Sequence, residues 1–211
     1  MKVTLVKTIA CAIVLAAGMF LPPQAIADDV RLSGFPALIL SGGTAKSTSY
    51  EIPQPFNNMV RADALEIAFG TTTLDVIQKE FGGEIRTRGS GADAVSWVCY
   101  QVALDGHASN LWFISNGEGS ASKRLLTMVS AEESETARSG CSQGPETLTS
   151  WVLPVPGLKD GEAELQKAFG MAIHDGIIRY EYENGSTLQS LVYRVNNGQI
   201  DGMSFSQVTA K

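Results

Sequence analysis

Hydrophobic and polar residues alternate along three stretches near the C-terminus, between residues 177 and 208. Asn184-Gly185 and Asn197-Gly198 separate these stretches, and such pairs favour tight hairpins because both residue types tolerate positive φ. The pattern predicts a three-stranded antiparallel meander, with an apolar face against a helix and the other face toward solvent or a partner. The charged residues predicted to form that partner-binding face are Arg179, Glu181, Glu183 and Arg194.

A helix is predicted within residues 71–83, where a threonine can cap the start and glycines can close the end. Its apolar residues fall on one face, and they are Leu74, Ile77 and Phe81. The helix closes with Ile-Gln-Lys-Glu-Phe-Gly at 77–82, which is similar to Leu-Gln-Lys-Ala-Phe-Gly at 165–170. Strand-like stretches follow both segments, so an internal duplication is the simplest explanation.

The repeated order of helix, strands and turn predicts an α+β fold of two tandem repeats, each a helix packed on a small antiparallel β-meander. The first helix/sheet unit is expected at 61–131 and the second at 155–211, with a connector at 132–154. Residues 28–60 hold several glycines and prolines and one short apolar run. They are expected to form an N-terminal arm with one strand.

The first 27 residues have the anatomy of a signal peptide. Lys2 and Lys7 precede an apolar stretch from Ile9 to Phe20, and small residues lead to a cleavage site after Ala27. A stretch of about a dozen residues is shorter than the roughly 20 that span a bilayer, so a retained anchor is the less favoured alternative. The sequence before Cys11 lacks the apolar run of a lipoprotein signal. A periplasmic or secreted protein is expected, with no stable membrane insertion after cleavage.

Removal of residues 1–27 leaves 14 basic and 22 acidic residues, a formal charge of −8, so no basic footprint for nucleic acid is present. It also leaves only Cys99 and Cys141. An even number of cysteines in an exported chain predicts a disulfide. The bond would close a loop of roughly 43 residues and stabilise the fold by about 4 kcal/mol. Its expected role is to hold the connector on the first sheet.

The helix ending in Phe-Gly and followed by a meander, twice over and after a signal peptide, resembles two families of envelope proteins. One comprises the SmpA/OmlA outer-membrane assembly lipoproteins, and the other the secreted β-lactamase-inhibitor proteins. The resemblance covers roughly residues 65–130 and 155–208. It implies a tandem helix-and-sheet fold that binds proteins. The helix motif of these families falls on Thr71, Thr73, Ile77, Phe81 and Gly82, and again on Lys159, Gly161, Leu165, Phe169 and Gly170.

This chain departs from the family pattern in two ways. The glycine that starts the helix motif is missing from both units, or is shifted to Gly70 in the first. The lipobox of the assembly lipoproteins is missing as well, which argues against a lipid anchor.

Several short motifs suggest chemistry, but each has a simpler interpretation. Ser120-Ala-Ser-Lys123 matches a Ser-x-x-Lys nucleophile motif, yet it stands in a Gly/Ser turn without its companion motifs. His107 and His174 each stand near an aspartate in a turn, with no metal-ligand spacing. Glu132, Glu133 and Glu135 are interpreted as a solvated connector, because they lack the spacing of an EF-hand. The segment 42–47 lacks the glycines of a phosphate-binding loop.

The sequence therefore predicts a noncatalytic protein-interaction module of the cell envelope, of the inhibitor or the assembly/adaptor type. Its partner would be another envelope or secreted protein, and no catalytic residue, cofactor or metal is expected. Two alternatives remain open. One is an envelope hydrolase that uses Ser120 with Lys123 or His174 with Asp175. The other is a carrier of a small ligand.

Overall fold

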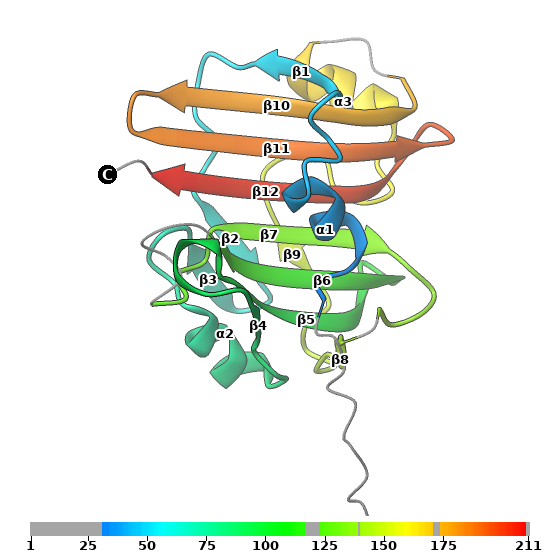
Figure 1. Cartoon of the computed structure of the whole chain (residues 1–211). Helices are drawn as coiled ribbons and strands as arrows, with labels where there is room; N and C mark the ends of the chain where they lie inside the picture. The colour runs from blue at the N-terminus through cyan, green and yellow to red at the C-terminus, as the bar shows by residue number, and fades with distance from the viewer. Residues whose placement is uncertain (1–30, 117–122, 139, 171–173, 210–211) are drawn as a thin grey trace, which may run out of the picture.

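The computed structural model describes residues 31–116, 123–138, 140–170 and 174–209. The largest element of the fold is one mixed nine-stranded sheet with the order β1-β10-β11-β12-β7-β6-β5-β4, in which β8 also pairs with β5 (Figure 1). The bounds of its strands are β1 Thr48–Glu51, β4 Arg86–Arg88, β5 Val95–Leu104, β6 His107–Asn116, β7 Met128–Glu133, β8 Ser142–Gln143, β10 Gly176–Asn184, β11 Thr187–Asn196 and β12 Gln199–Thr209.

A second, three-stranded sheet has the order β3-β2-β9 and packs, with two of the helices, on one face of the large sheet. This side is called the core face here. The third helix, α1, contacts β7 and β12 on the opposite side, called the α1 face. Bounds are β2 Met59–Ala62, β3 Leu65–Ala68, β9 Trp151–Val152, α1 Gly34–Leu40, α2 Leu74–Phe81, α3 Glu162–Phe169 and the 3₁₀ turn η1 Gly91–Asp93.

Elements that depend on local sequence form where the pattern predicts them. Helix α2 begins after Thr73, whose side chain accepts a hydrogen bond from the Val76 amide, and it ends at Gly82. The turns at Asn184-Gly185 and Asn197-Gly198 join β10, β11 and β12 into the predicted antiparallel meander. Capping and turn chemistry involve neighbours in sequence, so they are readable without the tertiary structure.

The prediction of an α+β fold with two tandem repeats, each with its own small sheet, is wrong. Strand β12 pairs antiparallel with β7, in a register from Gly202 opposite Glu132 to Ser206 opposite Met128. This pairing joins β5-β6-β7 and β10-β11-β12 into one continuous sheet, to which β1, β4 and β8 add further strands. Alternation in the sequence shows which residues share a face, but it does not show which strand edges meet.

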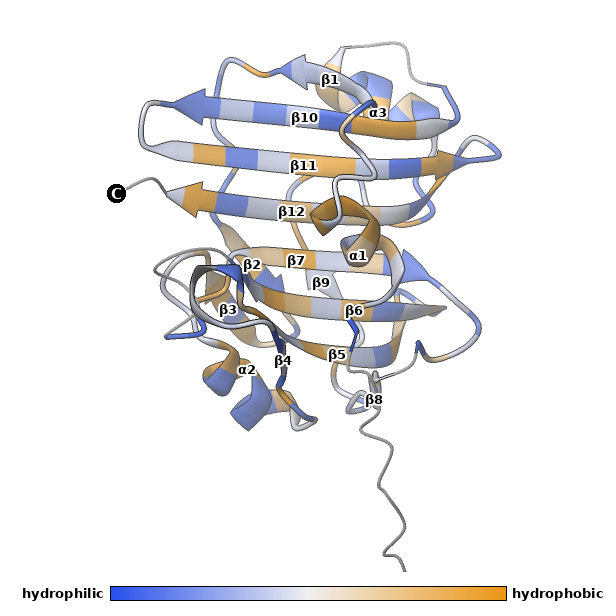
Figure 2. Ribbon diagram, in the orientation of Figure 1, coloured by the Kyte–Doolittle hydropathy of each residue, from blue (hydrophilic) through white to orange (hydrophobic). Residues whose placement is uncertain are grey.

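The N-terminal arm contains a helix in addition to the predicted strand. Its apolar run, residues 37–40, lies in helix α1, and strand β1 follows it. Figure 2 shows α1 as a strongly hydrophobic segment lying across the sheet, over β12 and β7. Ile39 and Leu40 pack on apolar side chains of the sheet, whereas Leu38 is exposed, so the helix is amphipathic.

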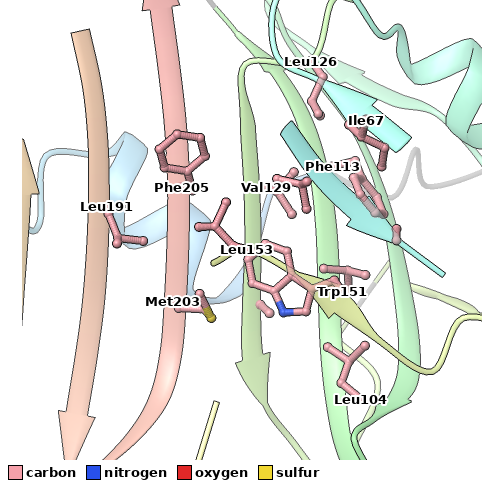
Figure 3. Packing of buried hydrophobic residues seen from close by; sticks show 14 of the residues in the cluster. Ile67, Leu104, Phe113, Leu126, Val129, Trp151, Leu153, Leu191, Met203 and Phe205 are labelled. Atoms are coloured by element: carbon pink, nitrogen blue, oxygen red, sulfur yellow. The ribbon is translucent and has the colours of Figure 1, made fainter. Parts of the chain in front are cut away.

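The main core lies between the large sheet and the elements on its core face. Phe113, Val129 and Phe205 come from three neighbouring strands and point toward the small sheet (Figure 3). Trp151 and Leu153 pack against them from the segment around β9. All of these side chains are at least nine-tenths buried, which makes this layer the main source of hydrophobic stabilisation.

Three buried tyrosines line the same core. The Tyr100 hydroxyl donates to the Gly82 carbonyl at 2.7 Å, and the Tyr193 hydroxyl donates to the Pro156 carbonyl at 2.8 Å. Tyr180 stacks on Phe169 with ring centroids 3.9 Å apart, and its hydroxyl is buried without a hydrogen-bond partner among the described residues. Burial disfavours the phenolate, so it raises the pKa of Tyr180 to about 12 and also raises those of Tyr100 and Tyr193.

Candidate functional site

Helix α1 covers an apolar patch on its face of the sheet. Trp97, Trp112 and Met128 form this patch, and each is at least 97% buried. Cys99 belongs to the same layer and forms the predicted disulfide with Cys141, with a Cα–Cα distance of 4.5 Å. The predicted pairing of the two cysteines is therefore confirmed. The bond holds the segment that includes β8 beside β5.

The start of α1 is held by a completely buried carboxylate. Glu132 Oε2 accepts a hydrogen bond from the Phe35 amide at 3.0 Å, and Oε1 receives Arg138 Nε at 2.6 Å. Arg194 Nη1 lies 3.8 Å from Oε2, which adds a second cation. A buried carboxylate is tolerated only where donors and cations surround it, and Glu132 meets this condition. The interpretation of Glu132 as a solvated connector residue is therefore wrong.

Gly34 allows this close approach of helix and sheet. Its φ is +77°, and a Cβ atom there would lie 2.7 Å from Glu132 Oε1 and 2.8 Å from the Trp112 ring. A side chain would be strained by the backbone conformation and would also collide with both neighbours. A residue without a side chain is thus needed where α1 meets the buried carboxylate.

The two arginines of the predicted partner-binding face are engaged within the molecule. Arg194 pairs with Asp201 at 2.6 Å and lies over the Phe35 ring, 5.2 Å from its centroid. Arg179 donates to the carbonyl and hydroxyl oxygens of Thr44, in the segment that follows α1. Both side chains therefore fasten the N-terminal arm to the sheet.

The two glutamates of the predicted face lie beyond the reach of α1. Glu181 pairs with Arg179 at 3.3 Å and accepts a hydrogen bond from Ser49 of β1, whereas Glu183 is exposed. With Glu51, they line a pocket of about 400 Å³ at the edge of the sheet. The arrangement concentrates three carboxylates at one end of β1 and β10.

Two exposed apolar side chains continue this surface across the sheet. Leu188 pairs with Glu183 of β10 on one side and with Val208 of β12 on the other. Leu188 is 42% exposed and Val208 48% exposed. We call the surface formed by Glu51, Glu181, Glu183, Leu188 and Val208 the acidic corner. Neighbouring apolar side chains with a charged margin match the apolar centre and polar rim of protein interfaces.

The remaining predicted candidates lie elsewhere. His174 and His107 are both exposed, and Asp175 accepts a hydrogen bond from the Gly198 amide at a hairpin turn. Ser120 lies outside the described residues, so its arrangement with Lys123 is not described. Residues 42–47 form consecutive turns that lead from α1 to β1.

The described residues contain no group of three or more His, Cys, Asp or Glu residues that could hold a metal ion. None of the helices in these same ranges combines the length and hydrophobicity that crossing a membrane requires.

Comparison of the chain with protein-family models, with curated proteins and with solved structures gives no match in any of the three. The resemblance to envelope assembly lipoproteins and β-lactamase-inhibitor proteins therefore stays a prediction from short motifs.

Proposed function

We propose that this protein is a noncatalytic interaction module of the cell envelope and that it binds a basic protein surface through the acidic corner. The observation that supports this most is the row Glu183, Leu188 and Val208, which lies side by side on three strands and is exposed throughout. A flat sheet face with two apolar anchors and a charged margin suits a protein partner better than a small ligand.

The charge of the corner selects the partner. Glu51, Glu181 and Glu183 lie close together, and the chain after residue 27 carries a formal charge of −8. Carboxylates at the margin of an interface speed the encounter with a positively charged partner, whereas apolar anchors at its centre supply most of the affinity. We therefore expect a partner whose contact surface has lysines or arginines around an apolar recess.

Export is part of the proposal. The disulfide, and the lack of a membrane-spanning helix among residues that the structure describes, are compatible with an extracytoplasmic protein. A location in the periplasm or outside the cell is the more specific form, and it rests on the signal-like residues 1–27. Two versions of the function then differ in their readout. An inhibitor would bind one enzyme tightly and abolish its turnover, whereas an adaptor would copurify with a complex of several proteins.

The test uses a pair of substitutions in the acidic corner. Residues 28–211 are used to capture partners from the envelope fraction, and each candidate is then purified and its affinity measured by titration calorimetry. Glu183→Lys with Leu188→Ser is expected to weaken binding at least tenfold, because it reverses a charge and removes an apolar anchor. Thermal unfolding should be unaffected, since both side chains are exposed.

A matched control variant makes the same changes on α2. Val76 is 47% exposed and Glu80, one turn later, is exposed as well. Val76→Ser with Glu80→Lys should leave the affinity unchanged. Equal affinities of the wild-type protein and the corner variant would refute the acidic corner as the binding surface.

A further inference from the structure

A second surface of the same strands has a different chemistry from the acidic corner. On the core face, the ends of β10, β11 and β12 and the loop 55–58 enclose an open pocket of about 350 Å³. Its polar lining consists mainly of neutral side chains, namely Asn57, Asn58, Tyr182, Asn184, Thr187 and Gln207. We call this site the amide pocket. It lies on the opposite side of the sheet from the acidic corner, because Tyr182 and Glu183 are neighbours whose side chains point to opposite faces.

One buried side chain fixes the shape of the amide pocket. Gln189 is 2% exposed, and its carbonyl oxygen accepts a hydrogen bond from the Phe56 amide at 2.8 Å. Its amino group donates to the Phe56 carbonyl at 3.1 Å and to Gln207 Oε1 at 2.9 Å. These bonds hold the loop against the sheet and orient the Gln207 side chain. A site that is already ordered loses less conformational entropy when a ligand binds.

The other polar groups of the pocket have hydrogen-bonding capacity to spare. The Gln207 amino group has no acceptor in the described ranges, and the same is true of the Asn57 amino group, whose carbonyl oxygen accepts from the Met59 amide. Tyr182 accepts a hydrogen bond from Asn184 and can still donate its own proton. Asn58 and Thr187 offer both donors and acceptors. The free groups therefore present donors and acceptors next to one another.

This chemistry fits the hydroxyl groups of a sugar. Each hydroxyl donates one hydrogen bond and accepts two, which is what neighbouring amide and hydroxyl side chains can match. The lining of this pocket contains no charged residue among those described, so a phosphate, carboxylate or ammonium group would find no counter-charge in it. A neutral ligand rich in hydroxyl groups needs none.

A second pocket of about 420 Å³, with both apolar side chains and polar groups in its lining, extends the site. It shares Phe56 and Asn57 with the amide pocket and is also lined by Leu153, Val155 and Phe169. The two pockets together offer aromatic and aliphatic surface beside hydrogen-bonding groups. A pyranose ring has the same division, because its C–H face is apolar and its edge carries hydroxyl groups.

We propose that the amide pocket binds a neutral saccharide, with its hydroxyl groups on Asn57, Asn58, Thr187 and Gln207 and its apolar face or an acetyl group against Phe56. This is a site separate from the acidic corner, so either proposal can fail without the other.

The test is an NMR titration of ¹⁵N-labelled residues 28–211 with three probes, which are chitotriose, maltotriose and trialanine. The side-chain amide signals of Asn57, Asn58 and Gln207 are expected to shift and saturate with a sugar at concentrations up to about 10 mM, a range that detects millimolar affinity. Binding of chitotriose but not maltotriose would show that the second pocket, beside Phe56, takes an acetamido group. Binding of both sugars would show recognition of hydroxyl groups only. Either result supports the proposal.

Variants tie the signal to the site. Asn58→Ala with Thr187→Val removes two free polar groups and is expected to weaken sugar binding at least tenfold. Asn196→Ala with Thr48→Val makes the same exchanges at exposed positions outside both pockets and should change nothing. Two results would overturn the proposal: no saturable shift with either sugar, or shifts with trialanine alone, which would make the pocket a peptide site.

Discussion

The two faces of the large sheet hold their neighbours in different ways. On the core face, helices and the small sheet are attached by a continuous layer of buried apolar side chains, including Phe113 and Phe205. On the α1 face, the N-terminal arm rests on a smaller apolar patch and on specific polar contacts to Glu132 and Arg179. The first arrangement should lose little stability when any one polar group is removed, whereas the second depends on a few polar contacts. The α1 face also leaves one corner of the sheet exposed, and this acidic corner is the surface that we propose binds a partner.

Among the predicted changes, removal of the disulfide should have the largest effect on the free energy of unfolding. Cys99→Ala with Cys141→Ala is expected to lower the free energy of unfolding by about 4 kcal/mol, because the bond closes a loop of 42 residues in sequence separation. Urea titration with and without reductant measures the change. The double variant should be insensitive to reductant, and equal stability of the oxidised and reduced wild-type protein would contradict the expectation.

Loss of the buried carboxylate of Glu132 should have the second-largest effect on the free energy of unfolding. Glu132→Ala removes the acceptor of the Phe35 amide and the partner of two arginines, at an expected cost of roughly 2–3 kcal/mol, since both arginines are partly exposed and can regain water. Detachment of α1 should also expose Trp97 and Trp112 to acrylamide quenching of their fluorescence.

The neighbouring residue provides the control for this substitution. Glu133 pairs with Lys159 at a partly exposed position. Glu133→Ala should therefore cost no more than about 1 kcal/mol and leave the quenching unchanged. Similar effects of the two substitutions would mean that Glu132 has no special part in docking α1.

High pH should lower the stability of the protein mainly through the tyrosines of the core face. Below pH 10 the tyrosines are protonated in both the folded and the unfolded chain, so their contribution to stability is complete. Above pH 10 the unfolded chain releases protons that Tyr100, Tyr180 and Tyr193 retain in the fold, because burial raises their pKa. The free energy of unfolding should fall between pH 10 and the Tyr180 value of about 12. Chemical unfolding at several alkaline pH values measures this, and a flat profile over that range would contradict it.

The smallest predicted changes in stability are those of substitutions at two of these tyrosines at neutral pH. Tyr193→Phe should cost about 1 kcal/mol, because it leaves the Pro156 carbonyl without its donor. Tyr180→Phe should be neutral or slightly stabilising, since it removes a buried hydroxyl that has no partner within the described ranges. Parallel thermal melts of the two variants give the comparison, and a larger loss for Tyr180→Phe would reverse it.

The sequence predicts those parts of this fold that depend on neighbours along the chain. The cap at Thr73, the hairpin turns and the pairing of Cys99 with Cys141 all follow from local pattern or from cysteine count. The single large sheet does not, because the pairing of β7 with β12 joins residues 70 to 78 positions apart. The apparent duplication in the sequence predicts two separate sheets, but periodicity carries no information on how strand edges associate.

The candidate sites show the same limit. Alternation correctly separates Arg179 and Glu181 from the apolar side of β10, but it does not show that Thr44 binds Arg179. Burial of Glu132 could have been suspected, because it directly follows Met128 to Ala131 of β7, an unbroken run of apolar or small residues that are all buried. The amide pocket is assembled from a loop and three strand ends, and no sequence motif marks it.

The attachment of the N-terminal arm also sets an order of folding. The Phe35 amide binds a residue 97 positions later, and Thr44 binds one 135 positions later. A chain that emerges from its N-terminus therefore presents α1 long before the strands that receive it exist. Contacts between such distant residues form slowly, because a long loop must close first. We therefore expect the hydrophobic α1 segment to stay undocked until β7 and β12, the strands that it contacts, have formed.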